Sequence, residues 1–247
     1  MKATPDDQLR LLDLQALDTA LDRLTHRRRT LPELAQIDEL DTRVTRLGDD
    51  IVLLDTEDSD LGREQSKLEV DIDQVRTRMQ RDQQRLEAGQ VGSPRELENL
   101  QSEIESLKRR QGDLEDAELE IMEKREVVQT RRDEIRAERE QTSTGLDAAE
   151  QRRDAAFAEI DAEHEKATAQ RAEVAVSLPA ELLGLYEKIR PSSAGVGAAA
   201  LHRGRCEGCH LQLNTTDVNR IREAPDDEVL RCEECRRILV RTGESGL

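Results

Sequence analysis

The stretch that decides the fold is IDELDTRVTRLGDDIVLL, residues 37–54. Its apolar side chains recur at alternating spacings of three and four residues: Ile37, Leu40, Val44, Leu47, Ile51 and Leu54. Side chains at this spacing lie on one stripe of an α-helix, and a sustained stripe with charged flanks is typical of a coiled-coil seam. The same phase continues as far as Leu86. The sequence therefore predicts a long helix that packs against another helix along this stripe.

A second arm with the same pattern follows a turn at residues 88–94. Two glycines in Ala88-Gly89-Gln90-Val91-Gly92 end the first helix. Ser93 then fits the N-cap of the next helix, Pro94 its first residue and Glu96 the capping-box partner. The apolar pattern resumes in the second arm: Leu97, Leu100, Ile104, Leu107 and onward to Val174.

The two arms, residues 6–87 and 94–175, are about equal in length. We therefore predict an antiparallel hairpin within one chain, in which the numbers of facing residues add to about 182. The alternative is a parallel dimer in which the turn only kinks the helix.

Polar residues interrupt the predicted seam at two positions. Asp58 and Gln65 occupy seam positions, and the predicted register places them opposite Glu118 and Arg125. Polar seam residues lower the stability of a coiled coil but can fix its register.

Each arm also contains a stretch that disfavours helix. Pro32 disturbs the first arm, and Thr142-Ser143-Thr144-Gly145 weakens the second arm at about the level of residues 37–40. These stretches predict either a bend of the coil or an ordinary restart of the first helix at Pro32 beside a tolerated glycine.

Composition excludes a large compact core. Charged residues make up 38% of the 247 residues and aromatic residues only 1%, namely Phe157 and Tyr186. Residues 179–247 hold ten Lys/Arg and eleven Asp/Glu, so −16 of the net charge of −17 belongs to residues 1–178. Acidic arms repel nucleic acid. With no signal peptide or long apolar run, we expect a cytoplasmic protein whose cysteines are reduced.

All four cysteines follow the pattern C-x2-C-x22-C-x2-C: Cys206, Cys209, Cys232 and Cys235. Each C-x2-C pair supplies two ligands from one tight turn, and four thiolates complete a tetrahedral zinc shell. We predict one structural Zn²⁺. Iron in a rubredoxin-like site is less favoured because no aromatic residue lies nearby in the sequence. Thiol–disulfide catalysis is also less favoured, because one shared metal explains both cysteine pairs. His202 and His210 flank the first pair and are not needed as ligands.

Three segments follow from these patterns: a coiled-coil hairpin over residues 1–176, a short helix and linker over 177–197, and a zinc ribbon over 198–247. The short helix opens near Leu178-Pro179 and ends before Pro191, and small residues at 192–197 predict a flexible linker. In the ribbon we expect three β segments and a helix capped within Asn214–Asp217 that runs to about Glu223. The β segments are Ala198–His202, Val229–Arg231 and Ile238–Val240. The metal replaces the core that so few residues cannot build.

The whole chain resembles the bacterial C4-type zinc ribbon family whose ribbon follows a long coiled-coil hairpin. The resemblance rests on the hairpin tip VGSPRELENLQSEI (91–104) and on the knuckles CEGCHLQL (206–213) and CEECRRILV (232–240). One departure is Arg236, where a glycine commonly follows the last cysteine. The resemblance implies a non-enzymatic adaptor, since family members are linked to protein partners and in some cases to RNA.

The favoured function is a zinc-binding adaptor that recognises a protein partner through the ribbon and the hairpin tip, the charged arms carrying no binding surface. The residues expected to contact the partner are Arg203, Arg205, Arg236, Arg237, Ser93, Pro94 and Arg95. The alternative is binding of RNA or DNA by the Arg-rich ribbon, although nearby acidic residues nearly cancel its charge and no aromatic residue offers a stacking platform. No sequence feature points to an enzyme, a small-molecule substrate or a membrane.

Overall fold

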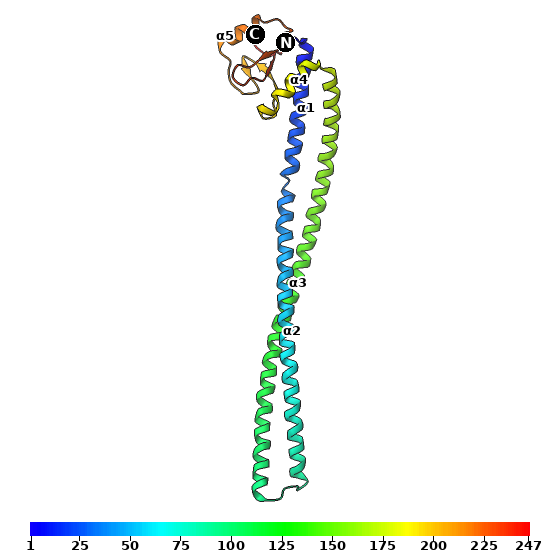
Figure 1. Cartoon of the computed structure of the whole chain (residues 1–247), viewed down its shortest axis with the longest axis vertical. Coiled ribbons are helices and arrows are strands. Elements are labelled where there is room, and N and C mark those ends of the chain that lie inside the picture. The colour runs from blue at the N-terminus through cyan, green and yellow to red at the C-terminus, as the bar shows by residue number, and fades with distance from the viewer. The chain divides into compact units, whose positions relative to one another are not determined.

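The computed structural model describes all 247 residues and contains two compact units. The hairpin unit is Ala35–Glu150, and the ribbon unit combines Met1–Leu34 with Gln151–Leu247. Figure 1 shows the elements in chain order: α1 (Pro5–Arg29), α2 (Pro32–Glu87), α3 (Pro94–Ser177), α4 (Ala180–Ile189), the 3₁₀ turn η1 (Pro191–Ser193), β1 (Ala198–His202), β2 (Arg205–Cys206), α5 (Thr215–Glu223), β3 (Leu230–Arg231) and β4 (Ile238–Val240). The predicted class, a mainly α chain with a long helical hairpin and a small ribbon, is confirmed. No helix is both long and apolar enough to cross a membrane.

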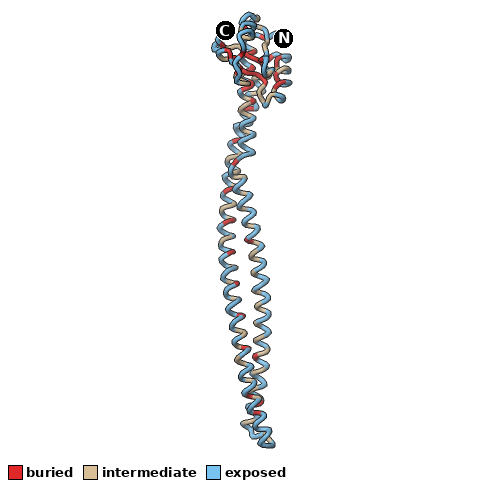
Figure 2. The backbone as a smooth tube through the Cα atoms, turned by 90° about the vertical axis from the view of Figure 1, so that its left-hand side faces the viewer, coloured by how far each residue is buried: buried red, intermediate tan, exposed pale blue.

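In the hairpin unit, α2 and α3 run antiparallel and pack along the predicted seam. The buried residues of the two helices include Leu47 and Ile72 on α2 and Leu114, Ile121 and Ile135 on α3. Figure 2 shows buried positions recurring at intervals along the helices, which are otherwise exposed or half-buried. Each helix thus buries only a narrow stripe of side chains, as the sequence pattern requires.

The turn between α2 and α3 follows the predicted residues. Gly89 adopts a φ of 62°, a left-handed conformation that glycine tolerates. The hydroxyl of Ser93 accepts a 3.3 Å hydrogen bond from the Glu96 amide, as expected for an N-cap. The Glu96 carboxylate accepts from the amide of Gly92 at 3.0 Å, one residue before the position that a regular capping box uses.

The register of the hairpin differs from the prediction. Arg125 donates hydrogen bonds to Asp58 and to Gln65, whose numbers add with its own to 183 and 190. Arg125 therefore lies level with residues 61–62 of α2, and facing numbers add to about 186 rather than 182. The cause lies at the tip, where residues 92–99 are exposed and Leu100 is the first buried residue of α3. Leu97, expected in the seam, is 37% exposed.

Arg125 is the partner that the predicted register gave Asp58, but Gln65 bonds to Arg125 rather than lying opposite Glu118. The Asp58 side chain has further partners. Its carboxylate accepts hydrogen bonds from Arg125 at 3.2 Å and from the Gln129 amide at 2.8 Å, and Arg132 lies 3.9 Å away. The polar layer is therefore a charge-compensated cluster.

Only the first arm is interrupted at the predicted weak points. α1 ends at Arg29 and α2 begins at Pro32, with Leu31 buried between them. In α3 the helix continues through Gly145, and the hydroxyls of Thr142 and Thr144 bond to carbonyls one turn earlier within the helix. Pro32 is thus the restart of a helix, and the threonines are tolerated.

In the ribbon unit, a four-stranded sheet of order β2-β1-β4-β3 separates two small cores. Side chains alternate between its faces: Ala198, Ile238 and Val240 join one core, and Ala199 and Leu239 join the other. The first core includes Leu11 and Leu14 of α1 and Leu182 and Tyr186 of α4. The second surrounds the cysteines and Ile221 of α5. The amino-terminal half of α1, which was predicted as part of the hairpin over residues 1–176, therefore packs with the ribbon strands and α4.

The segment at 192–197 is not the flexible linker that was predicted. Arg237 donates hydrogen bonds to the carbonyls of Ser193 at 2.8 Å and Val196 at 2.9 Å. The amide of Gly197 donates to Oε1 of Gln15 at 2.7 Å, and a Cβ on Gly197 would lie 2.7 Å from the Tyr186 ring. Small residues occur here because the backbone packs closely against α1 and α4.

Candidate metal centre

The two cysteine pairs occupy turns with the same hydrogen-bond pattern. In the first, the Cys206 amide donates to the Leu211 carbonyl and the His210 amide to the Cys206 carbonyl. In the second, the Cys232 amide donates to the Arg237 carbonyl and the Arg236 amide to the Cys232 carbonyl. In both turns, one bond therefore spans five residues and the other spans four. Two equivalent turns thus present two sulfur atoms each to one point between them.

The four sulfur atoms lie close enough to share one metal ion. Each Sγ is within 4.8 Å of the other three, and the Cys206–Cys235 and Cys209–Cys232 separations are both 3.9 Å. Zn–S bonds of about 2.3 Å in a tetrahedron place sulfurs about 3.8 Å apart, so the geometry fits zinc. All four cysteines are free thiols. The site can hold one zinc ion, as the spacing predicted.

Burial and hydrogen bonds from backbone amides shift the pKa values of these thiols in opposite directions. Burial raises the pKa of Cys206 to about 12, against hydrogen bonds from the amides of Cys209 and Gly208. Burial also raises the pKa of Cys232. For Cys235, burial is outweighed by hydrogen bonds from the backbone and side chain of Arg237, and its pKa falls to about 7. Zn²⁺ deprotonates the thiols that coordinate it, and the amides that point at the sulfurs then stabilise the thiolates.

The residue after the second cysteine of each turn adopts a left-handed conformation. φ is 60° at His210 and 62° at Arg236. Only glycine adopts this region without strain, which explains why a glycine is common at the Arg236 position. With arginine rather than glycine at position 236, the four sulfur atoms still lie within 4.8 Å of one another. His202 and His210 lie near Glu207 and are not part of the sulfur cluster.

A buried polar network, which sequence reasoning missed, joins the ribbon to the helices beneath it. The hydroxyl of Tyr186 donates to Asp18 at 2.7 Å and to Gln15 at 3.1 Å. Asp18 is 1% exposed and accepts a 2.7 Å hydrogen bond from Arg171 of α3. Gln15 accepts from the amides of Gly197 and Ala198 and donates to the Gly195 carbonyl. The one available signal was a lone Tyr in a chain almost without aromatic residues.

The predicted ribbon arginines fall into two groups. Arg237 is half-buried and bonded to carbonyls, so it holds the fold together rather than facing solvent. The other three are exposed: Arg205 pairs with Glu207 at 2.8 Å, Arg236 lies 3.6 Å from Glu233, and Arg203 has no ion-pair partner. Arg203 adopts a φ of 48° in the turn between β1 and β2. At the hairpin tip, Ser93, Pro94 and Arg95 are all exposed.

The fold and this site define a class of protein: an antiparallel helical hairpin that carries a four-cysteine zinc ribbon. Residues 14–194 match the CT398-like coiled coil hairpin domain, and residues 205–239 match the C4-type zinc ribbon domain. The chain belongs to the CT398-like hairpin family.

Relatives resemble the chain over nearly its whole length. An uncharacterized protein of Mycobacterium tuberculosis, Rv2229c, is 37% identical over 241 residues, which cover 98% of both chains. A solved structure from Mycobacterium smegmatis is 34% identical with a TM-score of 0.86, covering 98% of this chain and 100% of that one. CT398 from Chlamydia trachomatis has a TM-score of 0.72 at 19% identity, covering 96% of this chain and 98% of its own, a likeness of fold alone.

Proposed function

We propose that this chain is a non-enzymatic adaptor that recognises a protein partner through the zinc ribbon and the hairpin tip. The observation that carries the proposal is the metal centre itself. Four thiolates fill a tetrahedral shell, so a zinc ion held there has no open position for a substrate or an activated water. Such a centre stabilises a recognition surface rather than performing catalysis.

The surface around the centre has features that suit a protein partner. Leu211, next to the first turn, is 50% exposed, and the unpaired Arg203 stands at the exposed β1–β2 turn. An arginine in the left-handed region is strained by about 1 kcal/mol, and such strain concentrates at functional sites. Arginine is a common anchor in protein interfaces. At the tip, Arg95 and Leu97 are both exposed.

Nucleic-acid binding receives less support because most ribbon arginines are already engaged. Arg205 and Arg220 pair with glutamates at 2.8 and 2.7 Å. Arg237 and Arg241 donate to backbone carbonyls, which leaves few guanidinium groups for phosphates.

The test compares capture by the full zinc-loaded chain with capture by three variants. Arg203→Glu changes the ribbon, Arg95→Glu with Leu97→Ser changes the tip, and Lys166→Glu, an exposed charge reversal on α3, is the control. We expect one defined protein to be captured by the native chain and the control, and to be lost or reduced with the ribbon and tip variants. Zinc content is measured for each variant. Recovery of RNA in place of a protein, or equal capture by all variants, contradicts the proposal.

A further inference from the structure

The middle of the hairpin unit combines a polar layer in its seam with apolar side chains on its outer surface. We define the mid-hairpin segment as residues 52–70 of α2 and 116–134 of α3, which face each other in the observed register. Its seam contains Asp58, Gln65, Arg125 and Arg132, joined by hydrogen bonds and ion pairs. Its outer surface carries six large apolar side chains, each at least 45% exposed: Val52, Leu53, Val70, Leu119, Met122 and Val127.

This clustering is specific to the segment. Six of the seven exposed large apolar residues in the hairpin unit lie within it, and the seventh is Leu97 at the tip. Ile121 and Val128 are buried in the seam of this segment, but its polar layer and its exposed apolar side chains both depart from the pattern that stabilises a coiled coil. Departures of this kind from local consistency are expected at functional sites.

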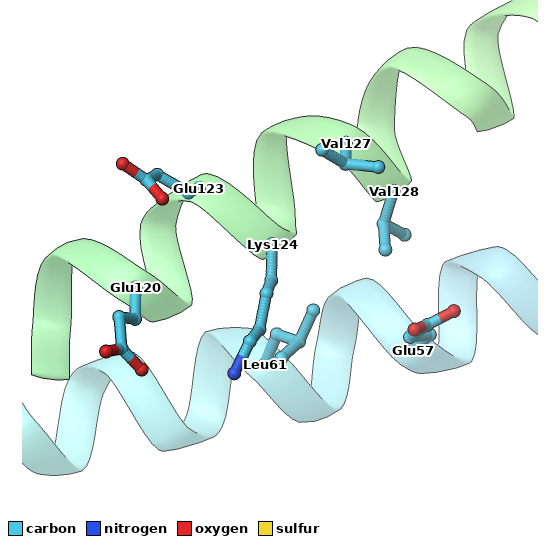
Figure 3. Close-up of a pocket in the computed structure, with 7 residues that line it drawn as sticks. All are labelled: Glu57, Leu61, Glu120, Glu123, Lys124, Val127 and Val128. Carbon is cyan, nitrogen blue, oxygen red and sulfur yellow. The ribbon is translucent and has the colours of Figure 1, made fainter.

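On one side of the segment, the two helices form a shallow groove of about 500 Å³. Leu61 of α2 and Val127 and Val128 of α3 provide its apolar lining. Figure 3 shows Val128 pointing toward α2, while the side chain of Lys124 extends from α3 to lie beside Leu61.

The groove is rimmed by carboxylates. Glu57 lines it from α2, and Glu120 and Glu123 line it from α3, with Lys124 the only basic residue of the lining. The whole segment contains thirteen Asp/Glu and six Lys/Arg, a net charge of −7. This charge disfavours a second copy of the chain on the same face, because two such segments repel each other. It favours an occupant with apolar side chains and flanking positive charges.

We propose that the mid-hairpin segment docks a basic amphipathic helix of another protein, laid along this groove. A helix fits because the groove runs along the line between α2 and α3 and offers apolar contacts at more than one turn. The occupant's leucine-like side chains cover Leu61, Val127 and Val128, and its Lys or Arg side chains meet Glu57, Glu120 and Glu123. This surface goes beyond the proposed function and changes the expectation that the arms carry no binding surface.

The experiment uses the full zinc-loaded chain and a fluorescent peptide of about 18 residues, five helical turns, built from Leu and Lys with all Leu on one face. A peptide of the same composition, scrambled so that Leu is spread around the helix, controls for charge alone. Binding is followed by fluorescence anisotropy at about 0.15 M salt, where long-range attraction is screened. We expect the amphipathic peptide to bind at least about tenfold more tightly than the scrambled peptide.

Three substitutions place the binding at the groove. Val127→Ser removes apolar lining and should weaken binding several-fold, while Val70→Ser, an exposed apolar position outside the lining, should leave it unchanged. Lys124→Ala removes the positive charge from the groove and should tighten binding, a gain that a misfolded variant could not produce. Equal binding of both peptides, equal effects of Val127→Ser and Val70→Ser, or a chain dimer abolished by Val127→Ser would each overturn the proposal.

Discussion

The hydroxyl of Tyr186 on α4 donates a 2.7 Å hydrogen bond to Oδ2 of Asp18 on α1, across 168 residues of sequence. Both side chains are almost fully buried, and Arg171 holds the other oxygen of Asp18 at 2.7 Å. Because Gln15 on the same face of α1 holds the backbone entering β1, this pair sits where the ribbon and the helices meet.

Replacing Tyr186 with Phe should therefore destabilise the ribbon unit. The substitution removes the one hydroxyl proton that Asp18 and Gln15 share, and leaving these buried acceptors without that donor costs about 1 to 3 kcal/mol. Urea unfolding followed by circular dichroism measures the change. Thr56→Ala, which removes an exposed hydroxyl bond on α2, is the control and should change stability by no more than about 0.5 kcal/mol. Equal losses in both variants would show that the buried network adds no stability.

The same tyrosine should make the chain sensitive to alkali. Burial, together with the hydrogen bond to Asp18 and its charge, raises the pKa of Tyr186 above the ordinary value of 10.0. Since the folded pKa lies above the unfolded one, this stabilisation is complete below about pH 10 and declines as the pH rises further. Tyr186 is the only tyrosine, so tyrosinate absorbance reports it alone. We expect that absorbance to appear together with unfolding. Ionisation near pH 10 in a fully folded chain would contradict the prediction.

The polar layer of the hairpin unit should respond to acid. The hydrogen bond from Gln129 lowers the pKa of Asp58, and Arg125 lowers it further. Burial acts in the opposite direction but is outweighed. A lowered folded pKa means that the stabilisation is present above the unfolded value of about 3.9 and is lost as the pH falls through the folded pKa. Asp58→Asn should cost about 1 kcal/mol at neutral pH, measured by urea unfolding. The difference between native chain and variant should shrink below about pH 4, whereas a constant difference would exclude ionic stabilisation by Asp58.

Arg236→Gly should stabilise the second cysteine turn. Arg236 adopts a φ of 62°, where a residue with a Cβ is strained by about 1 kcal/mol relative to glycine. The variant loses only an exposed ion pair with Glu233, so zinc transfer to a chelator should become slower. Glu234→Gly in the same turn has no strain to relieve, because Glu234 has no positive φ, and it should release zinc no more slowly than the native chain. Faster release from Arg236→Gly would mean that its side chain is needed.

The metal itself gives the last prediction. Purified chain should contain about one zinc per molecule, and Cys232→Ser should lose it, because three thiolates bind zinc less tightly than four. Cys232 is also buried in the second ribbon core, so ribbon strands should unfold while α2 and α3 of the hairpin unit stay helical. Elemental analysis and circular dichroism measure the two effects. His210→Ala should keep its zinc. Native chain without zinc and with disulfides would refute the assignment.

Much of this protein follows from signals within a few residues. The three-four spacing of Ile37 to Leu54 predicted the coiled helix, and Gly89 with Ser93 and Pro94 predicted where one helix ends and the next begins. Each C-x2-C pair predicted its turn, and Asn214 predicted the start of α5. These predictions succeeded because helical periodicity, caps and tight turns are stabilised by neighbours in sequence.

What the sequence could not determine depended on contacts between distant residues. The numbers of facing residues add to about 186 rather than 182 because the first turn of α3 has no facing turn on α2. This offset depends on how the loop between the two helices closes, and the pattern within either helix does not show it. Arg237 looked like a surface charge until the carbonyls of Ser193 and Val196 were brought beside it. Tertiary packing likewise joined Asp18 to Tyr186, because a buried carboxylate requires donors that no local pattern supplies.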